Sequence, residues 1–299
     1  MSILVVGSVA LDTVETPSGR AEEVLGGSAT YFAMAAGYFT RVNLVAVVGS
    51  DFPEDYLNLL QGRSIDLKGL EIREGKTFRW KGRYGEDPNE RETLSLCLNV
   101  FEDFHPQLSE DYCSSEYVFL ANIDPGLHLE ILKQLSGSKL IAGDTMNIWI
   151  EKRREALLRM LSGVDIFILN DSEAKMLTGE QNLIRAGRAI RSLGPGIAII
   201  KKGEHGVLLF SENDYFAAPA YPVESLCDPT GAGDSFAGGF LGYLAKNGRT
   251  DEGSLRKAVI YGSIMASYTV EGFSLDRLKS VTEEDVERKY RKFKNLVRF

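Results

Sequence analysis

The sequence predicts an α/β protein in which helices cover a mainly parallel central sheet, with a small β-sheet lid added beside it. Three observations lead to this prediction. Short runs rich in Val, Ile and Leu alternate with helical segments along most of the chain. These runs show no alternation of polar and apolar residues, as expected of strands buried on both faces. Two other segments, at about residues 11–24 and 72–100, carry short polar or alternating patterns without a helical period.

Six apolar runs are predicted as the buried parallel strands. They are Ile3–Gly7, Asn43–Gly49, Tyr117–Ile123, Lys139–Asp144, Asp165–Asn170 and Gly196–Gly203. Several runs end in or near a polar residue or glycine, namely Gly7, Asn122, Asp144, Asn170 and Gly203. Ligands of open α/β sheets bind at the carboxyl ends of the strands, so we expect these residues to gather at one ligand-binding edge.

The two irregular segments are interpreted as strands of a small added sheet. Turn signals such as Asp87-Pro88-Asn89 interrupt the second segment. A sheet beside the ligand edge would form a lid over the ligand, whereas a plain surface hairpin is the alternative. The sequence shows no repeat, low-complexity tract or linker, so residues 1–299 are treated as one domain.

Composition limits the class of partner. Lysine and arginine total 34 against 42 aspartates and glutamates, which gives a net charge of −8 and no overall positive field to attract nucleic acid. The three cysteines, Cys97, Cys113 and Cys227, lack the spacing of a zinc site or a disulfide framework. The start of the chain reads as a buried strand, and no apolar run reaches the ~18 residues of a membrane span. We expect a soluble, cytoplasmic protein that binds neither nucleic acid nor a membrane.

The segment Asp228–Ala245, DPTGAGDSFAGGFLGYLA, predicts a glycine loop that leads into a helix. Apolar residues at helical spacing follow the loop, at Phe236, Phe240, Leu241 and Leu244. The amino terminus of a helix offers unpaired backbone N–H groups and a positive dipole end, and small residues let a phosphate come close. The loop is therefore a candidate anion-binding site.

Asp234 follows this loop directly, where a carboxylate would repel a bound phosphate. Its presence is explained if it takes a proton from a hydroxyl that attacks the phosphate, as in a kinase. The alternative is that Asp234 only interacts favourably with the helix dipole.

Four motifs together resemble the ribokinase-like, or PfkB, family of carbohydrate and nucleoside kinases. They are GSVALD at 7–12, the diglycine at 26–27, NDSEA at 170–174 and DPTGAGDSFAGGF at 228–240. The resemblance runs from about Ile3 to about Gly272. It implies a ribokinase-like three-layer α/β/α fold with a small β-sheet lid, and transfer of the ATP γ-phosphate to an alcohol group.

The resemblance also implies roles for the residues of the phosphate site. Asp234 matches the catalytic base of the family. Asn170 and Glu173 match an N-x-x-E element that helps to hold Mg²⁺ on the nucleotide phosphates, although both residues could instead cap a helix that begins near Asp171 or Ser172. The matching anion hole consists of Gly231, Ala232 and Gly233.

On the substrate side, Asp12 matches the aspartate that binds substrate hydroxyls, with a turn residue as the alternative. Gly26 and Gly27 match the diglycine hinge of the lid. Many members continue the diglycine as G-G-x-x-x-N, but Tyr31 stands at the asparagine position here. The segment GDTMNIWI also departs from the D-P-N-x-R of several sugar kinases.

On the nucleotide side, the resemblance places the strand end and loop KKGEHG, Lys201–Gly206, beside ATP. The predicted contacts are Lys202, Gly203, Gly206 and Thr230, although Lys202 could be a solvated lysine. DPTG overlaps a loop at which many members bind a monovalent cation such as K⁺.

The acceptor is left open between two substrate classes. Tyr31 and the lid residues Phe78, Trp80 and Tyr84 could stack on a nucleobase, which favours the 5′-hydroxyl of a ribonucleoside such as adenosine. If these rings only fill the lid's own core, a free sugar such as ribose or fructose is the second candidate. A non-catalytic regulator that binds nucleotide is a further alternative, but it would not need Asp234. Exposed lid edges could also pair in a homodimer.

Overall fold

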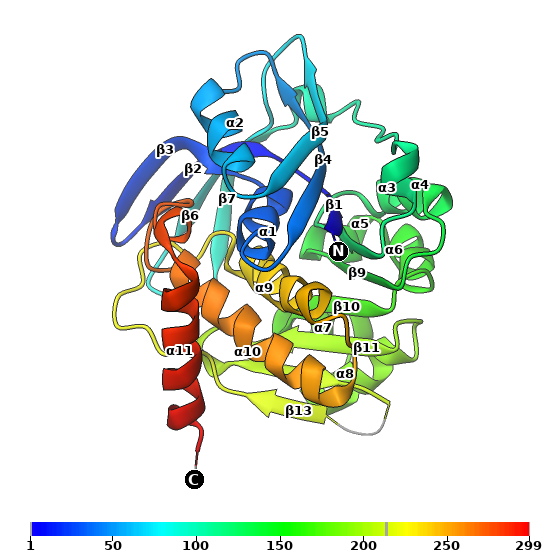
Figure 1. Ribbon diagram of the computed structural model, residues 1–299, viewed down its shortest axis with the longest axis vertical. Helices are drawn as coiled ribbons and strands as arrows, with labels where there is room; N and C mark the ends of the chain where they lie inside the picture. The colour runs from blue at the N-terminus through cyan, green and yellow to red at the C-terminus, as the bar shows by residue number, and fades with distance from the viewer. Residues whose placement is uncertain (1, 213–214, 299) are drawn as a thin grey trace.

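The computed structural model describes residues 2–212 and 215–298 and contains two sheets (Figure 1). The larger sheet has nine strands in the order β13-β12-β11-β10-β9-β8-β1-β4-β5. In chain order they are β1 (Ser2–Val6), β4 (Arg41–Gly49), β5 (Ile65–Arg73), β8 (Tyr117–Leu120), β9 (Leu140–Asp144), β10 (Ile166–Asn170), β11 (Ile197–Lys201), β12 (Val207–Phe210) and β13 (Tyr215–Ala218).

All six predicted strands lie in this sheet, and each pairs in parallel with its neighbours among them. β5 extends the parallel part beside β4, while β12 and β13 add an antiparallel edge. A prediction based on unbroken apolar runs missed β5 because charged residues interrupt it, and most of its positions are only partly buried. β12 and β13 are four residues each, too short to stand out from a loop.

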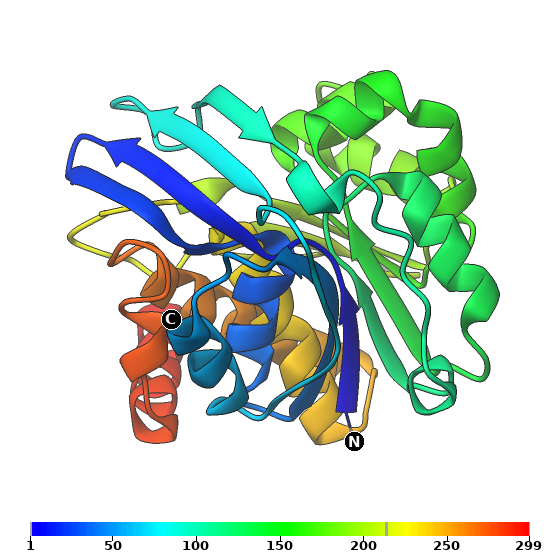
Figure 2. The same cartoon turned by 90° about the horizontal axis from the view of Figure 1, so that it is seen from above.

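Helices cover both faces of the large sheet (Figure 2). One core joins the sheet to α1 (Ser28–Ala36), α2 (Glu54–Gln61), α9 (Ala232–Asn247), α10 (Glu252–Thr269) and α11 (Glu283–Leu296). The other core joins it to α3 (Glu110–Cys113), α4 (Pro125–Gln134), α5 (Asn147–Lys152), α6 (Arg154–Leu161), α7 (Asp171–Thr178) and α8 (Leu183–Arg191). The predicted three-layer α/β/α fold is confirmed.

The small sheet has the strand order β3-β2-β6-β7, and we refer to it as the lid. Its strands are β2 (Ala10–Thr16), β3 (Gly19–Gly26), β6 (Arg79–Tyr84) and β7 (Arg91–Cys97). They come from the two irregular segments of the sequence and project together beyond the end of the large sheet (Figure 2). The second segment enters the lid only at Arg79, because residues 72 and 73 still belong to β5.

The two faces of the lid differ in chemistry. Glu15 on one face forms ion pairs with Lys81 and Arg83, so this face is polar. On the opposite face, the parallel register of β2 and β6 places Asp12 beside Trp80, and Tyr84 follows four residues after Trp80 at the end of β6. The face with Asp12 is the one turned toward the large sheet, since Asp12 is only 4% exposed.

Glycines let α9 pack closely against its neighbours. A Cβ at Gly238 would lie 2.4 Å from the carbonyl oxygen of Phe32 in α1. A Cβ at Gly239 would lie 2.7 Å from the Met265 side chain in α10. The close contacts on both sides offset the low helix propensity of glycine and fix the position of the amino end of α9.

None of the helices in the described part of the chain is long and apolar enough to cross a bilayer.

Candidate active site

The candidate site lies where the carboxyl ends of the parallel strands face the lid. Asp144 ends β9, Asn170 ends β10 and Lys201 ends β11, and β10 pairs with β11 so that Asn170 stands opposite Lys201. Because neighbouring parallel strands end at the same edge, three polar residues distant in sequence lie side by side. The amino ends of α7 and α9 point to this same edge.

The predicted anion hole forms the start of α9, with Gly231 as the residue before the helix. Gly231 has a left-handed backbone, φ 74°, which glycine adopts without strain. A Cβ on Gly231 would lie 2.3 Å from the Tyr31 ring, and one on Gly233 would lie 2.5 Å from the ammonium nitrogen of Lys201. The glycine loop is therefore held between an aromatic ring and a cation, and Gly231 is sterically required because its φ is positive and the Tyr31 ring beside it is buried.

Asp234 lies in the first turn of α9 and is buried. Burial raises the pKa of Asp234 to about 6, while Lys201 and then Arg91 act to lower it. At neutral pH the carboxylate is mostly ionised, yet it is basic enough to accept a proton. This position is compatible with the predicted role of Asp234 as a general base.

Asn170 and Glu173 form a complete capping box at the start of α7. The Asn170 side-chain oxygen accepts the Glu173 N–H at 2.8 Å, and Glu173 Oε2 accepts the Asn170 N–H at 2.8 Å. The capping alternative is thus present in the structure, but it uses only one oxygen of Glu173. Burial raises the pKa of Glu173, and Lys201 is the main opposing influence.

Asp144 is a further acid at this edge and is 5% exposed. Its Oδ1 has no hydrogen-bond partner among the described residues. Burial raises the pKa of Asp144 well above its ordinary value, Asp234 raises it further, and Lys201 lowers it. A buried carboxylate oxygen without a partner is costly, which indicates that a ligand completes this site.

The carboxylates of this edge fit a magnesium ion that arrives with the nucleotide. Hard oxygen ligands suit Mg²⁺, which keeps several waters and takes one or two carboxylates together with phosphates. Glu173 and Asp144 are the candidates, each with an available oxygen. No group of three or more acidic, histidine or cysteine residues in the described chain could hold a metal by itself.

Asp12 lies on the opposite side of the site, against the diglycine. Its carboxylate fills the space of a side chain at Gly26, where a Cβ would lie 1.9 Å from Oδ2. Gly27, with φ 96°, stands directly before α1 and donates its N–H to Asp12. Burial raises the pKa of Asp12 to about 7, and Asp228 and Asp234 add to this effect. The diglycine therefore connects the lid to the large domain and makes room for Asp12.

The predicted stacking residues do not all have a free ring. Tyr31 is 1% exposed, and its ring covers Gly231. Tyr84 is 9% exposed, and its hydroxyl accepts a hydrogen bond of 3.3 Å from Thr230. Phe78 stacks on Phe101, with ring centroids 5.5 Å apart.

Trp80 is the remaining aromatic of the predicted set and is half-buried. Its ring lies along the backbone of Gly82, where a Cβ would come within 2.1 Å of it. The guanidinium carbon of Arg91 lies 5.3 Å from the ring centroid, and the indole N–H donates to Thr93 at 3.2 Å. Trp80 is thus a fixed aromatic ring on the site-facing side of the lid, with Gly82 and Arg91 packed against it.

The loop predicted to contact the nucleotide follows β11. Lys202 lies one residue beyond the strand, and its N–H donates to the Gly206 carbonyl at 2.7 Å. Gly203 and Gly206 have positive φ values of 55° and 88°. The lid turn reaches this loop, because Asn89 donates to Glu204 at 3.0 Å.

Sequence reasoning missed Lys201 and Arg91 as site residues. The predicted nucleotide contacts include Lys202, whereas the structure places Lys201 at the last position of β11, which faces the ligand edge. No sequence motif marked Arg91 as a site residue. Its position opposite Tyr84 follows only from the pairing of β6 with β7. Asp144 was noted only as a strand end.

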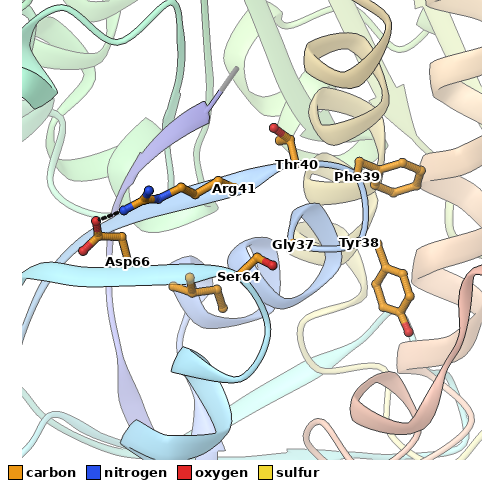
Figure 3. A pocket seen from close by; sticks show the side chains of 8 residues that line it. Gly37, Tyr38, Phe39, Thr40, Arg41, Ser64 and Asp66 are labelled. Atoms are coloured by element: carbon orange, nitrogen blue, oxygen red, sulfur yellow. Dashed lines mark hydrogen bonds and ion pairs between the residues drawn. The ribbon is translucent and has the colours of Figure 1, made fainter.

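A separate hollow of about 540 Å³ lies at the opposite edge of the large sheet (Figure 3). Residues 37–41 and 64–66 line it, at the amino ends of β4 and β5, and an Arg41–Asp66 ion pair crosses part of it. None of the acids of the candidate site lines this hollow. Open α/β sheets bind ligands at the carboxyl edge, so the hollow is not the candidate site.

Comparison with known proteins identifies the family. The model of the pfkB family of carbohydrate kinases matches residues 2–277, nearly the whole chain. The chain belongs to the pfkB family. It is an ATP-dependent phosphotransferase with an alcohol group as acceptor. The resemblance inferred from the four motifs is confirmed.

Two curated relatives cover most of the chain. A cytidine kinase of Thermococcus kodakarensis is 32% identical over 81% of this chain and 87% of its own length. A nucleoside kinase of Methanocaldococcus jannaschii is 24% identical over 87% of this chain and 82% of its own. Both relatives are named as kinases of nucleosides.

Solved structures share the fold of this pfkB kinase. The M. jannaschii nucleoside kinase structure has a TM-score of 0.77 at 21% identity and covers 97% of this chain and 98% of that one. The Burkholderia thailandensis nucleoside kinase in complex with inosine has a TM-score of 0.78 at 18% identity, with 98% of both chains covered.

Proposed function

We propose that this pfkB kinase transfers the γ-phosphate of ATP to the 5′-hydroxyl of a ribonucleoside. The observation that carries the choice of acceptor is the Trp80 ring on the site-facing side of the lid, opposite Asp12 in register. One residue could bind ribose hydroxyls while the other contacts the base. The similarity to a cytidine kinase and a nucleoside kinase over most of the chain supports the same acceptor class.

In the proposed reaction, Asp234 takes the proton of the 5′-hydroxyl as its oxygen forms a bond to the γ-phosphorus. The bond between that phosphorus and the bridging oxygen breaks, and ADP leaves with the electron pair. Backbone N–H groups at the start of α9 stabilise the charge on the transferring group. The left-handed Gly231 and its contact with Tyr31 hold these donors in place before substrate binds.

Two ions are proposed to accompany the nucleotide. Mg²⁺ would neutralise charge on the phosphates, with Glu173 and Asp144 on its protein side. A monovalent cation such as K⁺ would lie near Asp228, which is 1% exposed and whose Oδ2 has no partner among the described residues. Equal rates with and without potassium would exclude this second ion.

Asp12 is proposed to bind the sugar hydroxyls, and the diglycine 26–27 to serve as the hinge of the lid. Lys202, Gly203, Gly206 and Thr230 are proposed to line the nucleotide side. A homodimer through the lid would have to use its strand edges, because ion pairs of Glu15 occupy its outer face. Light scattering across a range of concentrations would detect such a dimer.

The test is a coupled ADP-release assay with ATP and Mg²⁺ against cytidine, uridine, adenosine, inosine, ribose and fructose. We expect a kcat/KM for one or more nucleosides at least tenfold above that for either sugar. Turnover restricted to ribose or fructose would replace the nucleoside with a free sugar while leaving the kinase chemistry in place. Tight ATP binding without turnover on a wide acceptor panel would favour the non-catalytic regulator.

A further inference from the structure

Lys201 extends from the end of β11 toward the start of α9. Its ammonium nitrogen is the atom that a side chain at Gly233 would meet, at 2.5 Å. Gly233 belongs to the anion hole, so the positive charge lies directly beside the backbone N–H groups that face the phosphate. The position of Lys201 follows from the pairing of β10 with β11, which places Lys201 next to Asn170 at the carboxyl edge of the sheet.

The ammonium group has no close partner in the described part of the chain. The Lys201 side chain appears in none of the ion pairs within 4.0 Å or hydrogen bonds found among residues 2–212 and 215–298. Lys289, another partly buried lysine, forms an ion pair of 2.8 Å with Glu271 and donates to Ser267 at 2.9 Å. A partly buried cation normally acquires such partners, so Lys201 is placed for a partner that binds later.

The surroundings indicate the chemistry of that partner. Lys201 acts electrostatically on three buried acids, Asp144, Glu173 and Asp234, yet pairs with none of them. Beside it, the first turn of α9 presents N–H donors to the same space. A cation and helix-terminal donors that converge on one space favour an anion with several oxygens, as in a phosphoryl group.

We propose that Lys201 donates a hydrogen bond to the phosphoryl group in transit between ATP and the acceptor. Lys201 keeps its protons throughout, because the proton of the acceptor hydroxyl goes to Asp234. The stabilisation grows as negative charge spreads over the three equatorial oxygens, so Lys201 lowers the barrier of the transfer step. Lys201 also favours the ionised form of Asp234, a second effect that rests on the proposed role of Asp234 as base.

The test compares Lys201→Met with the wild-type enzyme. Methionine keeps much of the side-chain volume and removes the charge. Lys139→Met is the matched control, because Lys139 lies just before β9 at the opposite edge and pairs only with Glu116. The readouts are kcat, calorimetric affinity for a non-hydrolysable ATP analogue and for ADP, the pH dependence of kcat, and the thermal midpoint.

We expect Lys201→Met to lower kcat by ~10²–10³, as observed when one charge-stabilising donor is removed from an active site. Affinity for the ATP analogue should fall about tenfold while that for ADP changes less than about threefold, since only the analogue carries the third phosphate. The acid limb of the kcat profile should move to higher pH. Lys139→Met should leave all of these values unchanged.

Three results would overturn the proposal. They are a kcat within about threefold of wild type, equal loss of affinity for ADP and the ATP analogue, or a loss of kcat explained by a lowered thermal midpoint. If Lys201→Met is poorly folded, Lys201→Arg provides a second test, because arginine keeps the charge. Lys201→Arg should then bind the ATP analogue in preference to ADP, as the wild type does, but less strongly. The affinities for the ATP analogue and for ADP do not depend on Asp234 as a base. The proposed role of Asp234 is tested separately with Asp234→Asn, so its failure is distinguishable from failure of the proposed role of Lys201.

Discussion

The sheet edge and the lid form the two halves of the site, and they are built in opposite ways. At the edge, Asp144, Glu173 and Asp234 are buried by well-packed strands and helices, so burial raises each pKa. In the lid, Trp80 and Arg91 are partly or largely exposed and lie on a four-stranded sheet whose outer face is charged. On this comparison we propose that the edge carries the chemistry, whereas the lid selects and covers the acceptor.

The largest effect is expected from Asp234→Asn. Loss of a positioned general base should lower kcat by ~10²–10⁴, with ATP affinity nearly unchanged. Steady-state kinetics and calorimetry measure the two quantities. Asp55→Asn is the control, because Asp55 is also an acidic residue in a first helical turn but lies exposed on α2. Near full activity in Asp234→Asn would reduce Asp234 to a helix-dipole residue.

The next effect concerns the glycine loop. Gly231→Ala introduces a Cβ at φ 74° that would clash with Tyr31. Gly179→Ala introduces a Cβ at nearly the same φ, 75°, but with no atom within 4 Å of it. Backbone strain should cost each variant about 1 kcal/mol of stability, and the clash with Tyr31 adds a further cost in Gly231→Ala only. Only Gly231→Ala should also lower kcat, by about tenfold or more, because it displaces the donors of the anion hole. Equal kcat values for the two variants would show that the loop geometry does not matter for transfer.

In the lid, Trp80→Ala should raise the KM for the nucleoside about tenfold and change kcat and ATP affinity little, since it removes a stacking surface. Arg83→Ala is the control on the same strand, because its side chain lies on the outer face and pairs with Glu15. An equal change in KM for Arg83→Ala, or an unchanged KM for Trp80→Ala, would remove the base contact from the account.

The smallest effect is on stability. The raised pKa of Asp144 means that the native state holds a proton that the unfolded chain has already lost above about pH 4. The stability of the wild type therefore falls as pH rises from about 4 through the native pKa. Asp144→Asn should raise the thermal midpoint by a few degrees at pH 8 and by little at pH 4, as measured by calorimetry. A lower midpoint at pH 8 would show that the carboxylate is well satisfied in the apo protein.

The sequence predicted the parts of the fold that rest on local patterns. Unbroken Val, Ile and Leu runs identified six parallel strands, and the helical spacing of Phe236 and Phe240 identified α9. The lid strands were recognisable from their alternation. β5, β12 and β13 escaped because short or charge-interrupted strands carry little local signal.

The site residues that belong to a contiguous sequence motif were predictable. Those whose position depends on the pairing of strands were less predictable. The glycine loop, Asp234 and the N-x-x-E element stand in contiguous segments. Lys201 and Arg91 take their positions from the registers of β10 with β11 and of β6 with β7. No local pattern tells which of two adjacent lysines ends the strand, and the structure places Lys201, not the predicted Lys202, at that position.

The most direct measurement of the central claim is the pH dependence of kcat for wild-type enzyme, Asp234→Asn and Lys201→Met with the preferred acceptor. Because Asp234 must be ionised to accept the proton and burial raises its pKa to about 6, kcat should decline below about pH 6. That limb should disappear in Asp234→Asn and move to higher pH in Lys201→Met. A wild-type profile that stays flat from pH 8 to pH 5, or a limb that survives in Asp234→Asn, would contradict the account.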